Sequence, residues 1–245
     1  ETYGSKDPRS EQLRIFVFTA GSSLTAQQPL NNVVRTSIEA LAAAMGGCQT
    51  MHVCAFDEAL GVPTEAAATL ALRTQQIVAF ETGLTDLVDP LGGSELLERL
   101  TDQLEAEVMA EMDKIAELGG ALACIESGYF ATRLSDSAYE TAIAIDTGKR
   151  KVVGVNSFVS DTAEFEVFTI DHESEARQIE SLLHVKEKRD QSQVTHTLEG
   201  LSKAAHDGIN IVPSVVLAVK AYATVGEITD VLREVYGKWE PTSSF

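Results

Sequence analysis

Two polar clusters directly follow strand-like apolar runs, and their residue types are suited to binding a ligand or transferring a proton. Gly21-Ser22-Ser23 follows the run at 14–18, and Asp57-Glu58 follows the run at 48–56. In a parallel α/β barrel the loops after the strands carry the ligand-binding groups, which makes both clusters candidates for a site. The alternatives are a plain loop for the first cluster and helix capping for the two carboxylates, which the helix dipole favours in any case.

Alternate residues of a strand lie on the same face, so each run predicts a pair of side chains on one face of its strand. Phe16 and Phe18 form the first pair, and His52 and Cys54 form the second. His52 and Glu58 are compatible with an acid–base pair, whereas the alternative for His52 is a hydrogen-bonded histidine of the core. Because the spacing does not distinguish the two, we predict no catalytic residue from it.

The composition argues against several kinds of site. The chain has 37 Asp and Glu residues against 19 Lys and Arg, a net charge of −18, and nucleic-acid phosphates are bound by clustered cations. We therefore expect no nucleic-acid partner. Three cysteines without C-x-x-C spacing and five dispersed histidines without H-E-x-x-H predict neither a disulfide framework nor a metal site. The turn at 88–94 lacks the glycine pattern and the lysine of common nucleotide-binding loops.

The apolar runs are too short for a membrane protein. The run from Ile211 to Tyr222 is shorter than a bilayer requires and is interrupted by Pro213 and Lys220. The first residues also lack the basic-then-apolar order of a signal peptide. We accordingly expect no membrane partner and a cytoplasmic location.

The elements that position the two clusters alternate between strand and helix. The runs at 14–18 and 48–56 predict strands, and helices are predicted at 30–44 and 63–82. In the first helix the apolar residues with helical spacing are Val33, Val34, Ile38, Leu41 and Ala42. Strand–helix–strand–helix order predicts an α/β fold with a parallel sheet or barrel. Two strands alone would leave open edges, so we expect further strands from another copy, subunit or segment.

The rest of the sequence is predicted to be mostly helical. A long amphipathic helix at 94–118 carries an apolar stripe and is followed by two glycines that end it. The stripe consists of Leu96, Leu97, Leu100, Leu104, Val108, Met112 and Ile115. The other predicted elements are helices at 121–127 and 133–147, a β pair at 151–155 and 165–170, and helices at 173–188, 193–206, 212–222 and 225–236.

Six collinear stretches, spread from about residue 4 to residue 237, resemble the large subunit of the methylmalonyl-CoA mutase family. The stretches are KDPRS, AGSSLTAQQPLNNVVRTSIEALAAAMGG, FDEALGVPTEAAATLALRTQQIVAFETG, VDPLGGSELLERLT, VVGVN and YATVGEITDVLREVYG. The resemblance implies that residues 1–93 are the last two β/α units of a (β/α)8 TIM-type barrel. It also implies that residues 94–245 are a mostly helical linker or collar segment.

The resemblance further implies a function. Members of this family are adenosylcobalamin-dependent acyl-CoA mutases, which are isomerases that rearrange a carbon skeleton by radical chemistry. The implied partners are an acyl-CoA substrate, a chain or segment that supplies the N-terminal barrel strands, and a cobalamin-binding small subunit or domain. The last is needed because the family's cobalt-binding Asp-x-His-x-x-Gly motif is absent, and Asp171-His172-Glu173 does not match it. The ending at 236–245 resembles the place where unfused large subunits stop.

The resemblance also carries roles onto matching positions. Gly21 and Ser22 match positions beside the corrin, and Glu58 matches a glutamate that binds the adenosyl ribose. The implied substrate cavity includes Gln49, Phe16, Phe18, His52 and Cys54.

At three of these positions the chain departs from its relatives. Relatives typically carry His and Gln in place of Phe16 and Phe18, and Asn in place of Cys54. Either the acyl substrate is less polar than usual, or the chain is a non-catalytic scaffold or assembly partner derived from the mutase.

Overall fold

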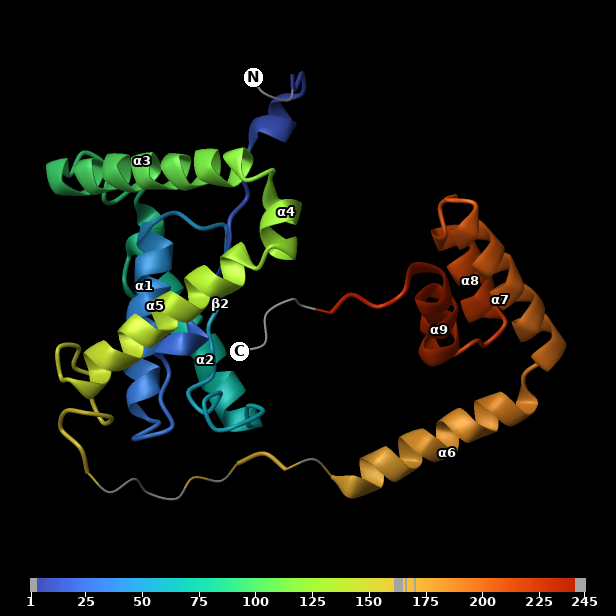
Figure 1. Ribbon diagram of the computed structural model, residues 1–245. Coiled ribbons are helices and arrows are strands. Elements are labelled where there is room, and N and C mark those ends of the chain that lie inside the picture. Colours follow the sequence, from blue (N-terminus) through green and yellow to red (C-terminus); the bar gives the residue numbers. More distant parts are fainter. Residues whose placement is uncertain (1–3, 161–164, 166, 170, 241–245) are drawn as a thin grey trace. The chain divides into compact units, whose positions relative to one another are not determined.

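The computed structural model describes residues 4–160, 165, 167–169 and 171–240 (Figure 1). The chain divides into two compact units, Glu1–Phe168 and Thr169–Phe245, and each is described by itself. The division reflects the compactness of each unit. The boundary between barrel and helical segment, predicted between residues 93 and 94, is a different property and stays a prediction. The described elements include parallel strands followed by helices, in agreement with an α/β class.

The first unit is built around a pair of parallel strands, β1 (Phe16–Phe18) and β2 (Thr50–His52). In their register Phe16 lies opposite Thr50 and Phe18 lies opposite His52. The predicted parallel pairing is therefore confirmed, although both strands are shorter than the apolar runs that predicted them.

Helices follow each strand in the first unit, as predicted. The unit contains η1 (Pro8–Glu11), η2 (Gly21–Ser23), α1 (Asn31–Met45), α2 (Glu65–Glu81), η3 (Leu84–Asp86), α3 (Glu95–Glu117), α4 (Ala121–Glu126) and α5 (Tyr129–Asp146). The α1 and α2 helices pack against each other. The Thr64 hydroxyl caps α2 by accepting a hydrogen bond from the Ala67 amide.

The buried face of α1 differs from the predicted apolar one. The buried residues are Asn32, Thr36 and Ala40, which follow one another at four-residue spacing. Val34 and Ile38, from the predicted stripe, are exposed. The physical reason is that the buried polar side chains of α1 are needed to bond the neighbouring loops, as described below.

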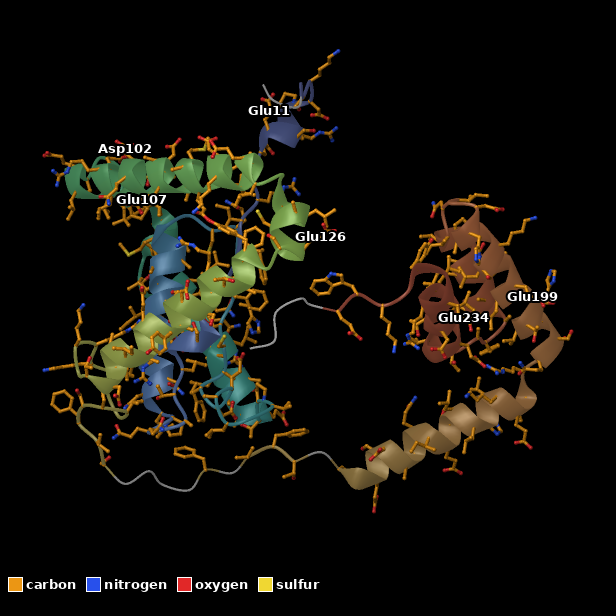
Figure 2. The ribbon with its side chains drawn as sticks, viewed as in Figure 1. Glu11, Asp102, Glu107, Glu126, Glu199 and Glu234 are labelled. Atoms are coloured by element: carbon orange, nitrogen blue, oxygen red, sulfur yellow. The ribbon has the colours of Figure 1, made fainter. Side chains whose placement is uncertain are left out.

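The long α3 helix buries none of its residues against the other described parts of the first unit. Each of its residues, all of which the structure describes, is exposed or half-buried. Figure 2 shows side chains projecting along α3, among them those of Asp102 and Glu107. At its end, the Tyr129 hydroxyl of α5 donates a hydrogen bond to Glu111 at 2.7 Å, and the Lys114 ammonium lies 5.3 Å from the centre of the Tyr129 ring.

The β pair predicted at 151–155 and 165–170 is wrong for the described residues. Residues 151 and 152 form no strand, and residues 153–157 form a turn closed by one isolated bridge, between Val153 and Ser157. The Asn156 side chain holds the turn closed, because its amide donates to the carbonyls of Ile145 and Arg150 and its oxygen accepts from the Val152 amide. Residues 165 and 167–169 form no strand, and residues 166 and 170 lie outside the described part.

The second unit contains α6 (His172–Lys188), α7 (Gln191–His206), α8 (Val212–Lys220) and α9 (Val225–Tyr236). These four predicted helices are confirmed. The α7 helix packs against both α8 and α9, around a core of Leu201, Ala218 and Ile228. Within the part of the chain that the structure describes, no helix combines the length and apolar character needed to cross a bilayer.

Candidate functional site

The exits of β1 and β2 are joined by hydrogen bonds immediately beyond the strands. The Thr19 amide donates to the His52 carbonyl at 3.0 Å, and the Cys54 amide donates to the Thr19 hydroxyl oxygen at 2.8 Å. The Cys54 Sγ lies 3.2 Å from the Thr19 carbonyl oxygen and donates to it. Thr19 and Cys54 are both buried. The two loops that follow therefore start from fixed and adjacent positions.

Three of the predicted site residues converge at these exits. A Cβ atom added to Gly21 would lie 3.7 Å from Glu58 Oε1 and 4.0 Å from Cys54 Sγ. Gly21 thus leaves bare backbone beside a carboxylate and a thiol. Ser22, the next residue of η2, is exposed.

The thiol of this cluster is held in its neutral form. Burial raises the pKa of the Cys54 thiol, and the negative charges of Glu58 and Glu39 act in the same direction, whereas the contact with Thr19 opposes them. A neutral thiol that donates its hydrogen to a carbonyl is a poor nucleophile. Cys54 therefore contributes an uncharged wall to the cluster.

Asn32 connects the two loops to α1. Its side-chain nitrogen donates to the carbonyls of Thr25 and Phe56, at 2.9 and 2.8 Å, and its oxygen accepts from the Thr25 amide and from Arg35. All four hydrogen-bonding positions of this fully buried amide are thus used. The same side chain fixes the loop after β1 and the loop after β2, which places Gly21 near Glu58.

Two further carboxylates position the loops. Glu39 of α1 accepts a hydrogen bond from the Ala20 amide at 2.7 Å, directly before Gly21. Asp57 Oδ2 accepts from the amide and hydroxyl of Thr64, at 2.9 and 2.8 Å, and so attaches the loop after β2 to the start of α2. Buried Asp57 Oδ1 finds no hydrogen-bond partner among the described residues.

Sequence reasoning missed Asn32 and Glu39 as positioning residues. Asn32 follows another asparagine at the start of a helix, where polar residues are common, and Glu39 lies in the middle of that helix. The one usable signal is that Asn32, Thr36 and Ala40 recur at four-residue spacing.

The remaining predicted residues form a second group on one face of the strands. The Phe16 and Phe18 rings contact edge to face with centres 4.8 Å apart, and the Phe18 and His52 rings are also 4.8 Å apart. The side chains of Phe16 and Phe18 remain 55% and 62% exposed. Val17 and Met51, which point to the opposite face, are half-buried. We call Phe16, Phe18 and His52 the aromatic face.

Gln49 directly precedes β2, at the opposite end of the strands from Gly21, Cys54 and Glu58. Its side-chain oxygen accepts from the Ile15 amide at 2.5 Å, and its nitrogen donates to the Gly47 carbonyl at 3.0 Å. The structure thus brings together Gly21, Cys54 and Glu58 at the strand exits, and leaves Gln49 bonded to backbone at the other strand ends.

One family model matches almost the whole chain. The model for methylmalonyl-CoA mutase matches residues 1–238. The chain belongs to the methylmalonyl-CoA mutase family. This confirms the resemblance that the sequence motifs indicated.

Individual members of the mutase family are similar over nearly the full chain. The 2-hydroxyisobutanoyl-CoA mutase large subunit of Aquincola tertiaricarbonis is 39% identical over 100% of this chain and 44% of the relative. The methylmalonyl-CoA mutase of Escherichia coli is 41% identical over 97% of this chain and 34% of the relative. The methylmalonyl-CoA mutase large subunit of Streptomyces virginiae is 38% identical over 96% of this chain and 33% of the relative. The chain therefore spans less than half the length of these relatives.

The side chains present at the site limit the chemistry that it can perform. The strand exits carry a glycine, a carboxylate and a neutral thiol, and the aromatic face lies on the strands themselves. Among the residues that the structure describes, no three His, Cys, Asp or Glu side chains gather as metal ligands. The groups present can accept hydrogen bonds and exclude water.

Proposed function

We propose that the chain forms part of an adenosylcobalamin-dependent acyl-CoA mutase that rearranges the carbon skeleton of its substrate. The observation that carries this proposal is the family match over residues 1–238. The convergence of Gly21 and Glu58 at adjacent strand exits supports it, because these two residues match cofactor-binding positions of the family. The relatives are named mutases, and mutases are isomerases. We propose this activity for the complete assembly and not for the chain alone.

In this proposal β1 and β2 are the last two strands of a (β/α)8 barrel. Each has one edge that is unpaired among the described residues. Open strand edges are normally covered by further strands, and a chain or segment that supplies the N-terminal strands would cover these. A cobalamin-binding subunit or domain would then face the carboxyl ends of the strands, where barrel enzymes hold their ligands.

The residues at the strand exits fit adenosylcobalamin. The bare backbone of Gly21 allows the flat corrin to approach, with Ser22 beside it, and Glu58 offers a carboxylate to the hydroxyls of the ribose. A charged acceptor makes a stronger hydrogen bond to such hydroxyls than a neutral one. When bound, adenosylcobalamin supplies a weak cobalt–carbon bond and hence the radical chemistry. The part of this chain is to bind the ribose, orient the cofactor and keep water away.

The test uses the chain assembled with the segments that complete the barrel and bind cobalamin. Adenosylcobalamin and a panel of CoA thioesters are added, and isomerised thioester is sought by mass spectrometry. Adenosylcobalamin affinity is measured separately from its absorbance spectrum. Glu58→Gln is expected to weaken binding about 5-fold to 10-fold, because the amide still accepts a hydrogen bond and loses only the additional strength of a charged one, about 1–1.5 kcal/mol. Glu65→Gln, on the exposed first turn of α2, serves as the control and is expected to change nothing.

A non-catalytic scaffold is the second candidate, favoured by one observation at Gln49. Its amide is bonded to the backbone of Ile15 and Gly47 and is not free to contact a substrate. The combined change Phe16→His, Phe18→Gln and Cys54→Asn separates the two functions. A scaffold would gain no activity from it, whereas new mutase activity in the variant, absent from the parent, would refute the scaffold. Turnover by the unaltered assembly would refute it as well.

A further inference from the structure

The α8 helix exposes a row of valines beside the core of the second unit. Its core side is occupied by Ala218, which is fully buried. Val212, Val216 and Val219 follow one another at spacings of four and three residues, so they lie on one face of the helix. These three residues are 60%, 46% and 56% exposed. An exposed apolar surface of this kind commonly marks a protein interface, and we call the three residues the valine stripe.

The sequence around the valine stripe is almost free of charge. Residues 208–226 contain no Asp or Glu and a single Lys, although the whole chain has a net charge of −18. The exposed apolar residues of α3 and α6 have different surroundings, because α3 has eight acidic residues against two basic ones and α6 has four against three. Two copies of so acidic a chain repel each other, and they approach with least repulsion where carboxylates are absent. The valine stripe is therefore suited to binding a second copy of the chain.

The ends of α8 carry charges that fit this arrangement. Lys220 is the last residue of α8, and Asp207 ends α7 shortly before α8 begins. Both residues are exposed, and neither side chain makes a hydrogen bond or an ion pair within the part of the chain that the structure describes. When two α8 helices run antiparallel, the last residue of each lies beside the start of the other, so Lys220 of one copy approaches Asp207 of the second. The surface is thus complementary to itself in charge as well as in apolar character.

The position of the valines also suits a two-fold axis. The α8 helix has nine residues, and Val216 is the middle one. A two-fold axis at Val216 places the two Val216 side chains against each other, and it places Val212 of each copy near Val219 of the other. Reciprocal contacts of this kind are typical of dimers of identical chains.

We propose that two copies of the chain associate through the valine stripes of antiparallel α8 helices, with an ion pair between Lys220 and Asp207 at each end. The two-fold axis of the pair passes through Val216. All of the residues involved belong to the second unit, so the proposal and its test do not depend on the mutase function.

Sedimentation velocity of the full chain over a range of concentrations tests the association. We expect twice the mass of a single chain at high concentration. Val216→Glu should raise the dissociation constant about 100-fold or more, because two like charges would meet at the axis without a partner. Leu183→Glu is the matched control, since it places the same charge on an exposed leucine of α6. This control should change the dissociation constant by less than about threefold.

Charge reversal tests the orientation of the two helices. Lys220→Glu and Asp207→Lys should each weaken the association about tenfold, because each variant brings like charges together at both ends of the pair. The double variant exchanges the two charges and should restore the dissociation constant of the parent to within about threefold. A double variant that binds no more tightly than the single ones overturns the antiparallel arrangement and the proposal with it.

Cross-linking tests the axis directly, and it does not require that Val216→Glu folds. A disulfide needs its two Cβ atoms about 4 Å apart, so Val216→Cys should join two chains under mild oxidation, whereas Leu217→Cys, on another face of α8, should not. Non-reducing gel electrophoresis compares both variants with the parent chain, whose own free cysteines give the background. A single-chain mass at every concentration overturns the proposal, as do an unchanged dissociation constant in Val216→Glu and equal cross-linking of the two cysteine variants.

Discussion

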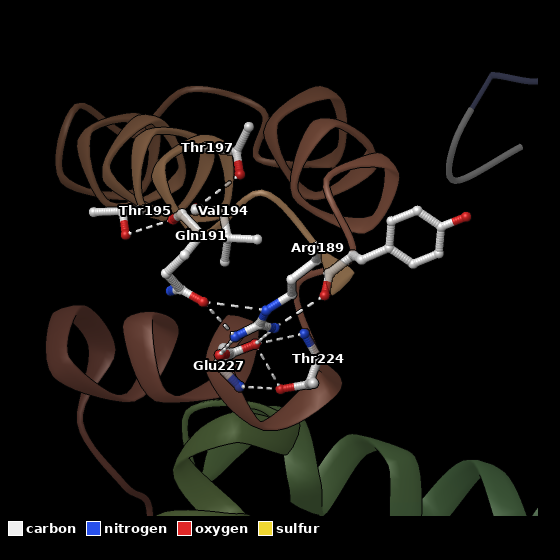
Figure 3. A network of polar contacts seen from close by, with 8 residues as sticks. Arg189, Gln191, Val194, Thr195, Thr197, Thr224 and Glu227 are labelled. Carbon is white, nitrogen blue, oxygen red and sulfur yellow. Dashed lines mark hydrogen bonds and ion pairs between the residues drawn. The ribbon is translucent and has the colours of Figure 1, made fainter. Parts of the chain in front are cut away.

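Replacing Glu227 with glutamine tests the ion pair that it forms with Arg189 in the second unit. Arg189 and Glu227 make two charged contacts, at 2.6 and 2.7 Å, and their side chains are 5% and 27% exposed (Figure 3). Glu227 also accepts hydrogen bonds from the amide and hydroxyl of Thr224, which completes the capping box of α9. The bonds from Arg189, and secondarily those from Thr224, lower the pKa of Glu227 from 4.5 to about 2, against the opposing effect of burial.

The size of the effect follows from this pKa. The difference between 4.5 and about 2, at about 1.36 kcal/mol per pH unit, corresponds to about 3.4 kcal/mol. Because Glu227 is partly exposed, solvent screening reduces this to about 2 kcal/mol. The folded-state pKa lies below the unfolded one, so the contribution is fully present above pH 4.5 and is lost as the pH falls towards about 2. Glu227→Gln also leaves the buried Arg189 charge unpaired, so we expect a loss of about 2–3 kcal/mol at pH 7.

The assay is urea unfolding followed by circular dichroism, at pH 7 and at several values between pH 5 and pH 3. Asp230→Asn is the matched control, because it breaks an ion pair with Arg233 whose side chains are both largely exposed. An exposed pair contributes about 0–1 kcal/mol, so the control should change little. The reasoning is refuted if Glu227→Gln costs no more than the control. It is also refuted if the variant loses as much stability on acidification as the parent.

Three further predictions concern the first unit. Asn32→Ala should lower the free energy of unfolding, measured in urea titrations, by about 3 kcal/mol or more. The substitution removes a buried amide that makes four hydrogen bonds, and it leaves the partners of that amide unpaired. A loss below about 1 kcal/mol would contradict the positioning role of Asn32. Gly21→Ala should leave the free energy of unfolding nearly unchanged, because the added Cβ lies at an ordinary contact distance of 3.7 Å from Glu58. The same substitution should weaken adenosylcobalamin binding in spectral titrations. Unchanged affinity would show that Gly21 is not part of the cofactor site. Cys54 should react with iodoacetamide at pH 8 far more slowly than the half-buried Cys48, because Cys54 is buried and its pKa is raised. Peptide mass spectrometry measures the two rates. Equal rates would show that the loop carrying Cys54 opens.

Sequence patterns predicted the elements whose signals are local. The parallel strands were indicated by short β-rich runs that alternate with helical patterns. The helices of the second unit also carry local end signals, such as the capping box of Thr224 with Glu227 at the start of α9. The β pair at 151–155 was wrong because the Asn156 side chain replaces strand bonds with turn bonds, and side-chain bonds of this kind compete with regular structure. The meeting of Gly21 with Glu58 followed from the parallel order of the strands and from the resemblance. The bond from Ala20 to Glu39 joins residues far apart in sequence, and no spacing rule indicates it.

The two groups of candidate residues are held in place by different means, and this has consequences for how the site is assembled. Gly21, Cys54 and Glu58 are positioned by Thr19, Asn32 and the Asp57–Thr64 pair, and these partners come from the same two β/α units. A buried polar network that is nearly fully bonded is rigid, so this half of the site is preformed within the chain. The aromatic face has no such frame, since Phe16 and Phe18 contact each other and His52 while much of each ring stays exposed. In the proposed assembly, the contribution of this chain to cofactor binding therefore depends on geometry that the chain already possesses, whereas the shape of the acyl cavity depends on what covers the aromatic face. Substitutions in the first group should consequently act on cofactor affinity, and substitutions in the second on the choice of acyl group.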